Sequence, residues 1–323
     1  MVPDNALVER FRADLDALIQ PGERIGIAVS GGPDSLALLM LAAAARPGEI
    51  EVATVDHGLR SGSREEAEMV ADLCERLGVP HAILAIEWDL PPTSAIQEQA
   101  RAVRYGALAQ WARERELRAL LTAHHLDDQA ETLVMRLNRG SGVRGLAGMR
   151  RQSSVPGDKD LPLLRPLLGW RRSELEQICT DGQISLATDP SNADERYERV
   201  RVRQALRDAD WLDPESLAKS AANLATADEA LEWAADREWS EAVETNDGRI
   251  VYRASTAPVE IMRRVVARVI AELATEGAAG ELRGRELDRL IADLQQCNTT
   301  TLRGVLCIGG LDWTFAVAPP RSS

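Results

Sequence analysis

The stretch IAVSGGPDS near the N-terminus brings together residue types that bind phosphate. Its apolar start predicts a strand, and the turn after it opens a helix, where unpaired backbone N–H groups and the helix dipole favour an anion. Gly31 and Gly32 carry no side chains that would keep a phosphate away. Ser30 and Ser35 add hydroxyl donors, and Pro33 suits the first turn of a helix. The stretch therefore predicts a phosphate cradle.

Asp34 lies inside this turn. A carboxylate beside phosphates is repulsive unless a cation lies between them, so we expect Asp34 to contact Mg2+. The alternative is an ordinary strand-to-helix turn in which Asp34 only caps the helix. The turn lacks the lysine of G-x-x-x-x-G-K-[ST] and the spacing of G-x-G-x-x-G, so it belongs to neither of those nucleotide-binding loops.

A second polar cluster, AHHLDDQAET, follows another apolar segment. His124 and His125 end a predicted strand, and Asp127 and Asp128 begin the next helix, so we expect them at the same sheet edge as the cradle. The imidazoles titrate near neutrality and could move protons or bind substrate phosphate. The alternative is a capping box formed by Asp128 and Glu131. Zinc is disfavoured because cysteine ligands are missing.

Two further pairs are candidates for contacts with the nucleotide. Arg101 and Arg104 are three apart on a predicted helix and project from neighbouring positions, although an ordinary solvated face explains them as well. His57 and Arg60 follow the second predicted strand, where a nucleoside would lie in a sheet of this type. A helix-entry loop explains this second pair almost as well.

The chain carries a formal net charge of −13, which counts against a polyanionic partner, but its middle is basic. Residues 135–172 hold nine basic side chains against two acidic ones, and residues 195–207 hold five arginines against two glutamates. These neighbouring runs predict a strip that contacts nucleic-acid phosphates. The alternative is a solvated surface.

The elements that position these residues alternate along the chain. Strands are predicted at 24–29, 51–55, 81–86 and 119–123, and helices at 35–45, 63–77, 94–116 and 129–138. This β-α series predicts an α/β fold, in which helices cover both faces of a parallel sheet and ligands bind beyond the carboxyl ends of the strands.

The second half of the chain is predicted to be mainly helical. We expect loops at 140–148 and 152–160, helices at about 172–179, 212–244 and 258–274, and short strands within 300–317. A domain boundary is placed near Trp211, which gives a catalytic domain over residues 1–211 and a smaller, mainly helical domain over residues 212–323.

Composition narrows the class of protein. With 323 residues, 45% hydrophobic and 28% charged, the chain is long enough for about two globular domains. No apolar run approaches a membrane span, and the charged N-terminus does not resemble a secretory signal, so we expect a cytoplasmic protein.

Four cysteines without a C-x-x-C pair disfavour a zinc knuckle or an iron–sulfur cluster. Most of the seven tryptophans are expected in the core.

The turn SGGPDS resembles the SGGxDS loop of the PP-loop ATP pyrophosphatases, which have an adenine nucleotide α hydrolase-like, Rossmann-like fold. Within that superfamily, the order of the further motifs is similar to that of the tRNA(Ile)-lysidine synthetases over about the first two-thirds of the chain. These motifs are VDHGLR (55–60), ARAVRY (100–105), AHHLDDQAET (123–132), RGSGVRGLAGM (139–149), LLRPLLGWRRSEL (163–175) and TDPSNADERYERVRVR (188–203). The last third resembles the smaller substrate domain only loosely, and the distal domain of longer members is expected to be absent.

The resemblance implies a two-step ligation. The C2 oxygen of a cytidine in the CAU anticodon of tRNA(Ile) attacks the α-phosphate of ATP and releases pyrophosphate. The amine of free L-lysine then displaces AMP to give lysidine. The implied partners are therefore ATP, tRNA(Ile) and lysine with Mg2+ as cofactor, and a homodimer is left open.

The resemblance also implies roles for individual residues. The expected catalytic residues are Asp34, Arg104, His124, Asp127 and Asp128, of which Asp127 or Asp128 would bind the lysine ammonium and assist its deprotonation. The expected ATP-binding residues are Ser30, Gly31, Gly32, Pro33, Asp34, Ser35, His57 and Arg101. The expected tRNA-binding residues are Arg139, Arg144, Asn192, Arg199, Arg201 and Arg203. Val200, where the family usually has asparagine, and the missing proline before Leu212 depart from the pattern and affect the expected local geometry.

Two other functions are carried forward. A tRNA thiolase on the same scaffold needs a sulfur-handling cysteine or cluster, which the lack of a C-x-x-C pair disfavours. A regulatory module that binds ATP without turnover needs neither the AHHLDD cluster nor the basic strip.

Overall fold

The computed structural model describes residues 2–58, 62–86, 96–184, 196–253, 256–274, 282 and 284–319. The chain forms two compact units, residues 1–225 and 226–323. The boundary predicted near Trp211 lies just before helix α9 (Pro214–Ala242), and the two units divide within that helix. Each unit is described separately.

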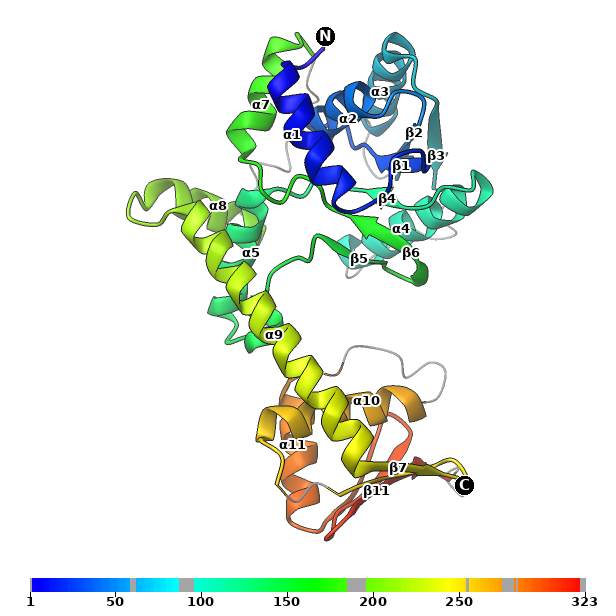
Figure 1. Cartoon of the computed structure of the whole chain (residues 1–323), viewed down its shortest axis with the longest axis vertical. Coiled ribbons are helices and arrows are strands. Elements are labelled where there is room, and N and C mark those ends of the chain that lie inside the picture. Colours follow the sequence, from blue (N-terminus) through cyan, green and yellow to red (C-terminus); the bar gives the residue numbers. More distant parts are fainter. Residues whose placement is uncertain are drawn as a thin grey trace. The chain divides into compact units, whose positions relative to one another are not determined.

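The first unit is built around a six-stranded sheet with the order β3-β2-β1-β4-β6-β5 (Figure 1). The strands are β1 (Ile25–Ala28), β2 (Ile50–Asp56), β3 (His81–Ala85), β4 (Leu120–Leu121), β5 (Gln152–Val155) and β6 (Asp158–Leu164). Every neighbouring pair is parallel except β5 and β6. The predicted parallel α/β sheet is confirmed, together with the predicted strands at the positions of β1 to β4.

Helices cover both faces of this sheet. Those in its two cores are α1 (Asn5–Asp16), α2 (Pro33–Ala45), α3 (Ser63–Leu77), α4 (Ile96–Glu114) and α7 (Arg172–Asp181). The same unit contains α5 (Leu126–Asn138), α6 (Val143–Leu146) and α8 (Glu198–Asp208). Leu121 of β4 packs on one face in a core that includes α1, α2, α3 and α7. Its neighbour Leu120 packs on the other face with Tyr105 and Trp111 of α4. Successive side chains of a strand point to opposite faces, so this two-sided core follows from the apolar runs in the sequence.

One expected loop is a hairpin. The prediction of a loop at 152–160 is wrong, because β5 and the start of β6 pair in antiparallel fashion there. The turn between them holds Pro156 and Gly157, and Gly157 has a φ of +85°, which favours glycine. Pro-Gly between two runs with strand propensity is a hairpin signal.

The second unit pairs helices with an antiparallel sheet. Helices α10 (Val259–Leu273) and α11 (Gly284–Gln295) pack with β7 (Val243–Asn246), β8 (Arg249–Tyr252), β9 (Thr299–Leu302), β10 (Val305–Ile308) and β11 (Trp313–Val317). The strand order is β7-β8-β11-β10-β9. The predicted helices and terminal strands are present, whereas α11, β7 and β8 were not predicted. A buried Arg264 joins α10 to the middle of α9 through Asp228, at 2.7 Å.

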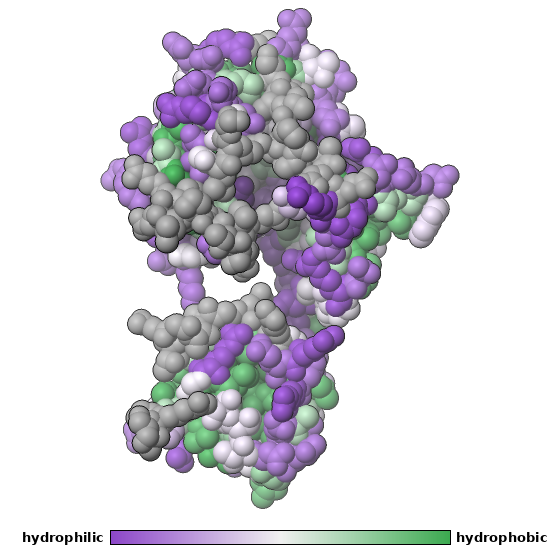
Figure 2. All heavy atoms as spheres, turned by 180° about the vertical axis from the view of Figure 1, so that it is seen from behind, coloured by the Kyte–Doolittle hydropathy of each residue, from purple (hydrophilic) through white to green (hydrophobic). Residues whose placement is uncertain are grey.

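The surface is mixed in polarity. Figure 2 shows hydrophilic side chains over much of the described surface, with apolar areas on the second unit. Trp111, Trp170 and Trp313 are buried as expected, but the prediction is wrong for Trp211 and Trp233, which are 78% and 63% exposed. None of the described helices combines the length and the apolar character that crossing a bilayer would require.

Candidate active site

The turn between β1 and α2 has the geometry of an anion cradle. Gly31 has a φ of +83°, a left-handed conformation that favours glycine. The Ser30 amide donates to Ser35 Oγ at 3.1 Å, and the Ser35 hydroxyl donates to the Gly32 carbonyl at 2.9 Å. Ser35 is buried and shapes the turn, whereas Ser30 is exposed. Pro33 is the first residue of α2, as predicted.

Gly32 leaves room for a ligand. Its φ of −76° is open to any residue, and an added Cβ would meet only Ser30 Oγ, at 3.8 Å, among the described atoms. The protein itself therefore has no steric need for glycine at this position. The first amides of α2 point toward this space, as backbone donors do at a helix N-terminus.

Asp34 lies between the cradle and the second cluster. Its Oδ2 is 3.5 Å from His125 Nε2, while its Oδ1 is buried and has no hydrogen-bond partner in the described part of the chain. A buried carboxylate oxygen without a partner is costly unless a ligand satisfies it. No cluster of three or more His, Cys, Asp or Glu among the described residues is arranged to hold a metal. Asp34 thus fits Mg2+, which proteins often bind through one or two carboxylates plus substrate phosphates.

The start of α5 is fixed by a capping box of His125 and Asp128. His125 Nδ1 accepts the Asp128 amide at 3.4 Å, and the His125 amide donates to Asp128 Oδ2 at 3.1 Å. The predicted box of Asp128 with Glu131 is therefore wrong. The helix begins at Leu126, so Asp128 occupies the third helical position and not the cap. Burial opposes ionisation of Asp128, but His125 and Arg199 hold its pKa below the usual value.

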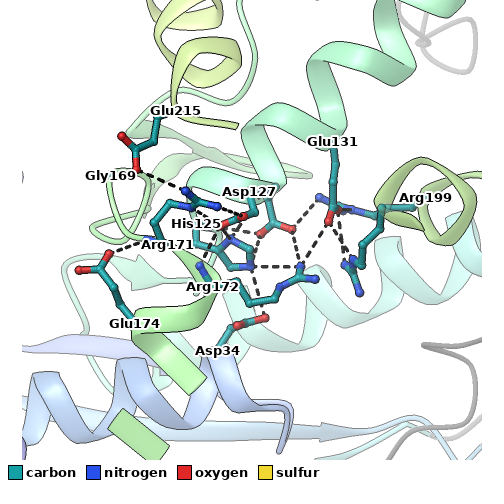
Figure 3. Close-up of polar contacts among 12 residues, drawn as sticks. Asp34, His125, Asp127, Glu131, Gly169, Arg171, Arg172, Glu174, Arg199 and Glu215 are labelled. Atoms are coloured by element: carbon teal, nitrogen blue, oxygen red, sulfur yellow. Dashed lines mark hydrogen bonds and ion pairs between the residues drawn. The ribbon is translucent and has the colours of Figure 1, made fainter. Parts of the chain in front are cut away.

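Asp127 holds the next helix of the site. Its Oδ2 accepts the backbone amide of Arg172 at 2.8 Å, and its Oδ1 lies 3.3 Å from Arg171 Nη2 (Figure 3). Asp127 therefore satisfies an amide at the N-terminus of α7, where a carboxylate also interacts favourably with the helix dipole.

Glu131 of α5 is 2% exposed and gathers three arginines (Figure 3). Arg199 Nε and Arg203 Nε of α8 each donate to it at 2.8 Å, and Arg172 Nη2 of α7 lies at 3.4 Å. Arg199 also donates to Asp128 at 2.9 Å. A buried carboxylate needs such partners, so these contacts bind α7 and α8 to α5.

His124 is placed beside this network, and its Nδ1 is 2.9 Å from Thr122 Oγ1. Burial lowers the pKa of His124 to about 4, and the charges of Arg165, Arg199 and Arg101 act in the same direction. Titration near neutrality, as expected from the sequence, is therefore wrong for this histidine. Its imidazole is neutral at physiological pH.

Arg101 and Arg104 of α4 flank Tyr105, with guanidinium carbons 5.0 and 5.2 Å from the ring centroid. Burial lowers the pKa of Arg104, and the charge of Arg101 adds to this effect. Arg165 follows β6, is 7% exposed, and donates to the Arg150 carbonyl at 2.7 Å. It was counted in the basic strip, but it is a buried group beside His124.

The residues after β2 occupy a loop at the same sheet edge. His57 follows Asp56, whose Oδ1 accepts the Ser63 hydroxyl at 2.6 Å and the Gly58 amide at 3.0 Å. These hydrogen bonds lower the pKa of Asp56 and fix the entry to α3. Arg60 lies outside the described residues.

The arginines expected to bind tRNA divide into two groups. Arg199 and Arg203 point at Glu131, and Arg139 pairs with Glu198. Arg144 and Arg201 are exposed, and Arg201 donates to the Arg196 carbonyl at 3.1 Å. Asn192 lies outside the described residues. The surface that can face a nucleic acid is therefore smaller than the arginine count suggested.

Sequence reasoning missed three residues that organise the site, namely Gln129, Arg171 and Arg172, and it did not predict that His125 caps α5. Gln129 is buried and clamps the 140–149 loop with two hydrogen bonds to the Met149 backbone, at 2.7 and 2.8 Å. The helix start at Leu126 was the available signal, since a residue before the first helical position that accepts a hydrogen bond serves as a cap. No local signal reveals the partners of Arg171 and Arg172.

Comparison with known proteins agrees with this geometry. The PP-loop domain family matches residues 6–209. A tRNA(Ile)-lysidine synthase from Novosphingobium aromaticivorans is 49% identical over 317 residues, covering 97% of this chain and 94% of that protein. One from Zymomonas mobilis is 42% identical over 300 residues, covering 92% of this chain and 89% of that protein.

A solved structure shares the fold at low identity. The U34-tRNA thiolase NcsA from Methanococcus maripaludis, with its 4Fe-4S cluster, aligns with a TM-score of 0.55 and 16% identity, over 71% of this chain and 80% of that chain. The sheet and the strand-to-helix turn define a PP-loop, ATP-using enzyme. Within that class the chain belongs to the tRNA(Ile)-lysidine synthase family, whose members are ligases that form a carbon–nitrogen bond. The predicted family and enzyme class are confirmed.

The low pKa of His124 predicts a stability profile. A histidine whose pKa is about 4 when folded and about 6.5 when unfolded stabilises the fold above pH 6.5, and this contribution is lost as the pH falls toward 4. His124→Asn should therefore show a shallower loss of unfolding free energy between pH 6.5 and 4, by at most about 1.4 kcal/mol per pH unit. Urea unfolding at each pH measures this slope. Identical slopes for His124→Asn and the unmodified chain would contradict the buried neutral imidazole.

Proposed function

We propose that this chain ligates lysine to C2 of the wobble cytidine of a CAU-anticodon tRNA(Ile), as the names of its relatives suggest. In the first step the cytidine C2 oxygen attacks the α-phosphate of ATP, and pyrophosphate leaves. In the second step a lysine amine attacks C2, loses a proton, and displaces AMP. The observation that carries the proposal is the cradle of residues 30–35 beside the α5 carboxylate of Asp128, whose pKa is held below the usual value by neighbouring positive charge.

The phosphate end of ATP is assigned to the cradle. The amides at the start of α2 and the hydroxyl of Ser30 would bind the departing diphosphate, and Asp34 Oδ1 would hold Mg2+. When bound, the ion supplies positive charge that neutralises the phosphates. Arg101 and Arg104 lie on α4 near His124, where they could meet a phosphate or the adenylated base.

The lysine site is assigned to Asp128. A free lysine amine has a pKa of about 10.4 and arrives as an ammonium ion, which an ionised carboxylate attracts. The pKa of Asp128 is low and that of His124 is about 4, so both are weak bases. Asp128 is therefore better suited to bind the ammonium than to remove its proton. Asp128 already accepts hydrogen bonds from an arginine of α8 and from a backbone amide, so the ammonium would share this carboxylate with them. Asp127 is engaged by the N-terminus of α7 and is assigned a positioning role.

For tRNA we assign Arg144 and Arg201, with Arg139, to the phosphate backbone. Arg144 and Arg201 are exposed, whereas Arg199 and Arg203 hold α8 on α5. Asn192, the homodimer and the cytoplasmic location remain predictions.

The rival functions receive less support. Burial raises the pKa of Cys74, Cys179 and Cys307 to about 12, which makes each a poor sulfur nucleophile. The remaining cysteine, Cys297, lies in the second unit. The sequence also has no C-x-x-C pair that could serve thiolase chemistry. A regulatory ATP-binding module would not need the buried carboxylates of α5.

Substrate-dependent pyrophosphate release tests the function. With ATP, Mg2+, lysine and a tRNA(Ile) transcript that carries the CAU anticodon, we expect one AMP and one pyrophosphate to form for each lysine incorporated. A tRNA(Met) transcript, which also carries CAU, and arginine in place of lysine are the controls. Equal release with every amino acid, or release that requires a sulfur donor, would reject lysidine synthesis.

The two aspartates of α5 should differ in their effect. Asp128→Asn removes the charge that would attract the ammonium ion, so lysine incorporation at saturating ATP and tRNA should fall by about a hundredfold or more. Asp127→Asn keeps an oxygen that can accept the Arg172 amide, so its effect should be about tenfold or less. Single-turnover lysine incorporation measures both. Equal losses in the two variants would remove the distinction drawn here.

A further inference from the structure

His125 joins the two halves of the site, yet it does not line the site's surface. Its side chain is 0% exposed, so it cannot contact a substrate directly. Figure 3 shows the ring between Asp34 and the polar residues of α5. The imidazole therefore acts on the reaction only through the groups that it holds.

Both nitrogens of the His125 ring have polar neighbours. Nδ1 accepts the amide hydrogen of Asp128 at 3.4 Å and lies 3.7 Å from Asp127 Oδ2. Nε2 lies 3.5 Å from Asp34 Oδ2 and 3.5 Å from Asp128 Oδ2, and Arg172 Nη2 lies 3.3 Å from it. The ring therefore contacts carboxylates from both halves of the site.

We propose that His125 is a positioning residue that orients Asp34 for the nucleotide. Oδ2 of Asp34 lies against the buried imidazole, so its Oδ1, which is without a partner in the described part of the chain, is the oxygen left for a ligand. The same ring caps α5, so the orientation of Asp34 is tied to the helix that carries Asp128. A histidine placed in this way couples phosphate binding to the lysine side of the site.

The rival explanation is that His125 is only a helix cap. A cap requires one acceptor, which asparagine supplies as well as any residue. Asparagine, however, is too short to contact Asp34 while it caps α5. Replacement by asparagine therefore separates the two roles, and alanine removes both.

The test compares His125→Asn and His125→Ala with the unmodified chain, and it rests on the ATP-dependent function proposed above. In His125→Asn we expect a smaller loss of unfolding free energy than in His125→Ala, because the cap of α5 is kept. Its affinity for ATP, with Mn2+ as the metal probe, should be at least about tenfold weaker when measured by calorimetry. Affinity for adenosine should stay the same. Wild-type affinity for ATP with Mn2+ in His125→Asn would overturn the proposal. If the unmodified chain itself failed to bind ATP, the proposed function would fail instead.

A second measurement does not depend on how well the variants fold. Nitrogen NMR of the unmodified chain, labelled at histidine, should show the ring resonances of His125, which His125→Asn assigns, shifting when ATP and Mg2+ are added and staying fixed when adenosine is added. No response to ATP with Mg2+ would overturn the proposal.

Discussion

The carboxylates in the first two turns of α5 are the constraint on which the site depends. Asp127, Asp128 and Glu131 are largely buried, and each must be matched by positive charge or by backbone donors. The partners come from α7 and α8, which follow in the chain by roughly 40 and 70 residues. An unpaired carboxylate at this depth would be costly, so these helices are held at the sheet edge where β1 and β4 end.

The same network determines which chemistry the site can do. Positive charge from Arg101, Arg165 and Arg199, added to burial, keeps His124 neutral, and Arg199 helps to keep Asp128 ionised. The site therefore offers fixed charges and hydrogen-bond donors. Neither His124 nor Asp128 is a strong base at neutral pH. Such an arrangement suits phosphate departure and ammonium binding, where charge stabilisation dominates. The overall charge of −13 hides this local positive field.

Much of this could be predicted from sequence because it is local. The glycines, proline and serine of the cradle define their turn within six residues, and the apolar runs define the parallel sheet. The pairing of Arg203 with Glu131 spans 72 residues, and nothing in either segment specifies the other. For this reason Arg199 and Arg203 were assigned to tRNA. The cap of α5 was misplaced by three residues because aspartate is a more familiar cap than histidine.

The central claim is that the turn of residues 30–35 binds the phosphates of ATP while Asp34 faces the metal. A crystal structure with a non-hydrolysable ATP analogue and Mg2+ tests this most directly. The account predicts the β- and γ-phosphates on the amides of this turn and Asp34 Oδ1 within coordination distance of the ion, about 2.1 Å. A nucleotide bound elsewhere, with this turn empty, would contradict it.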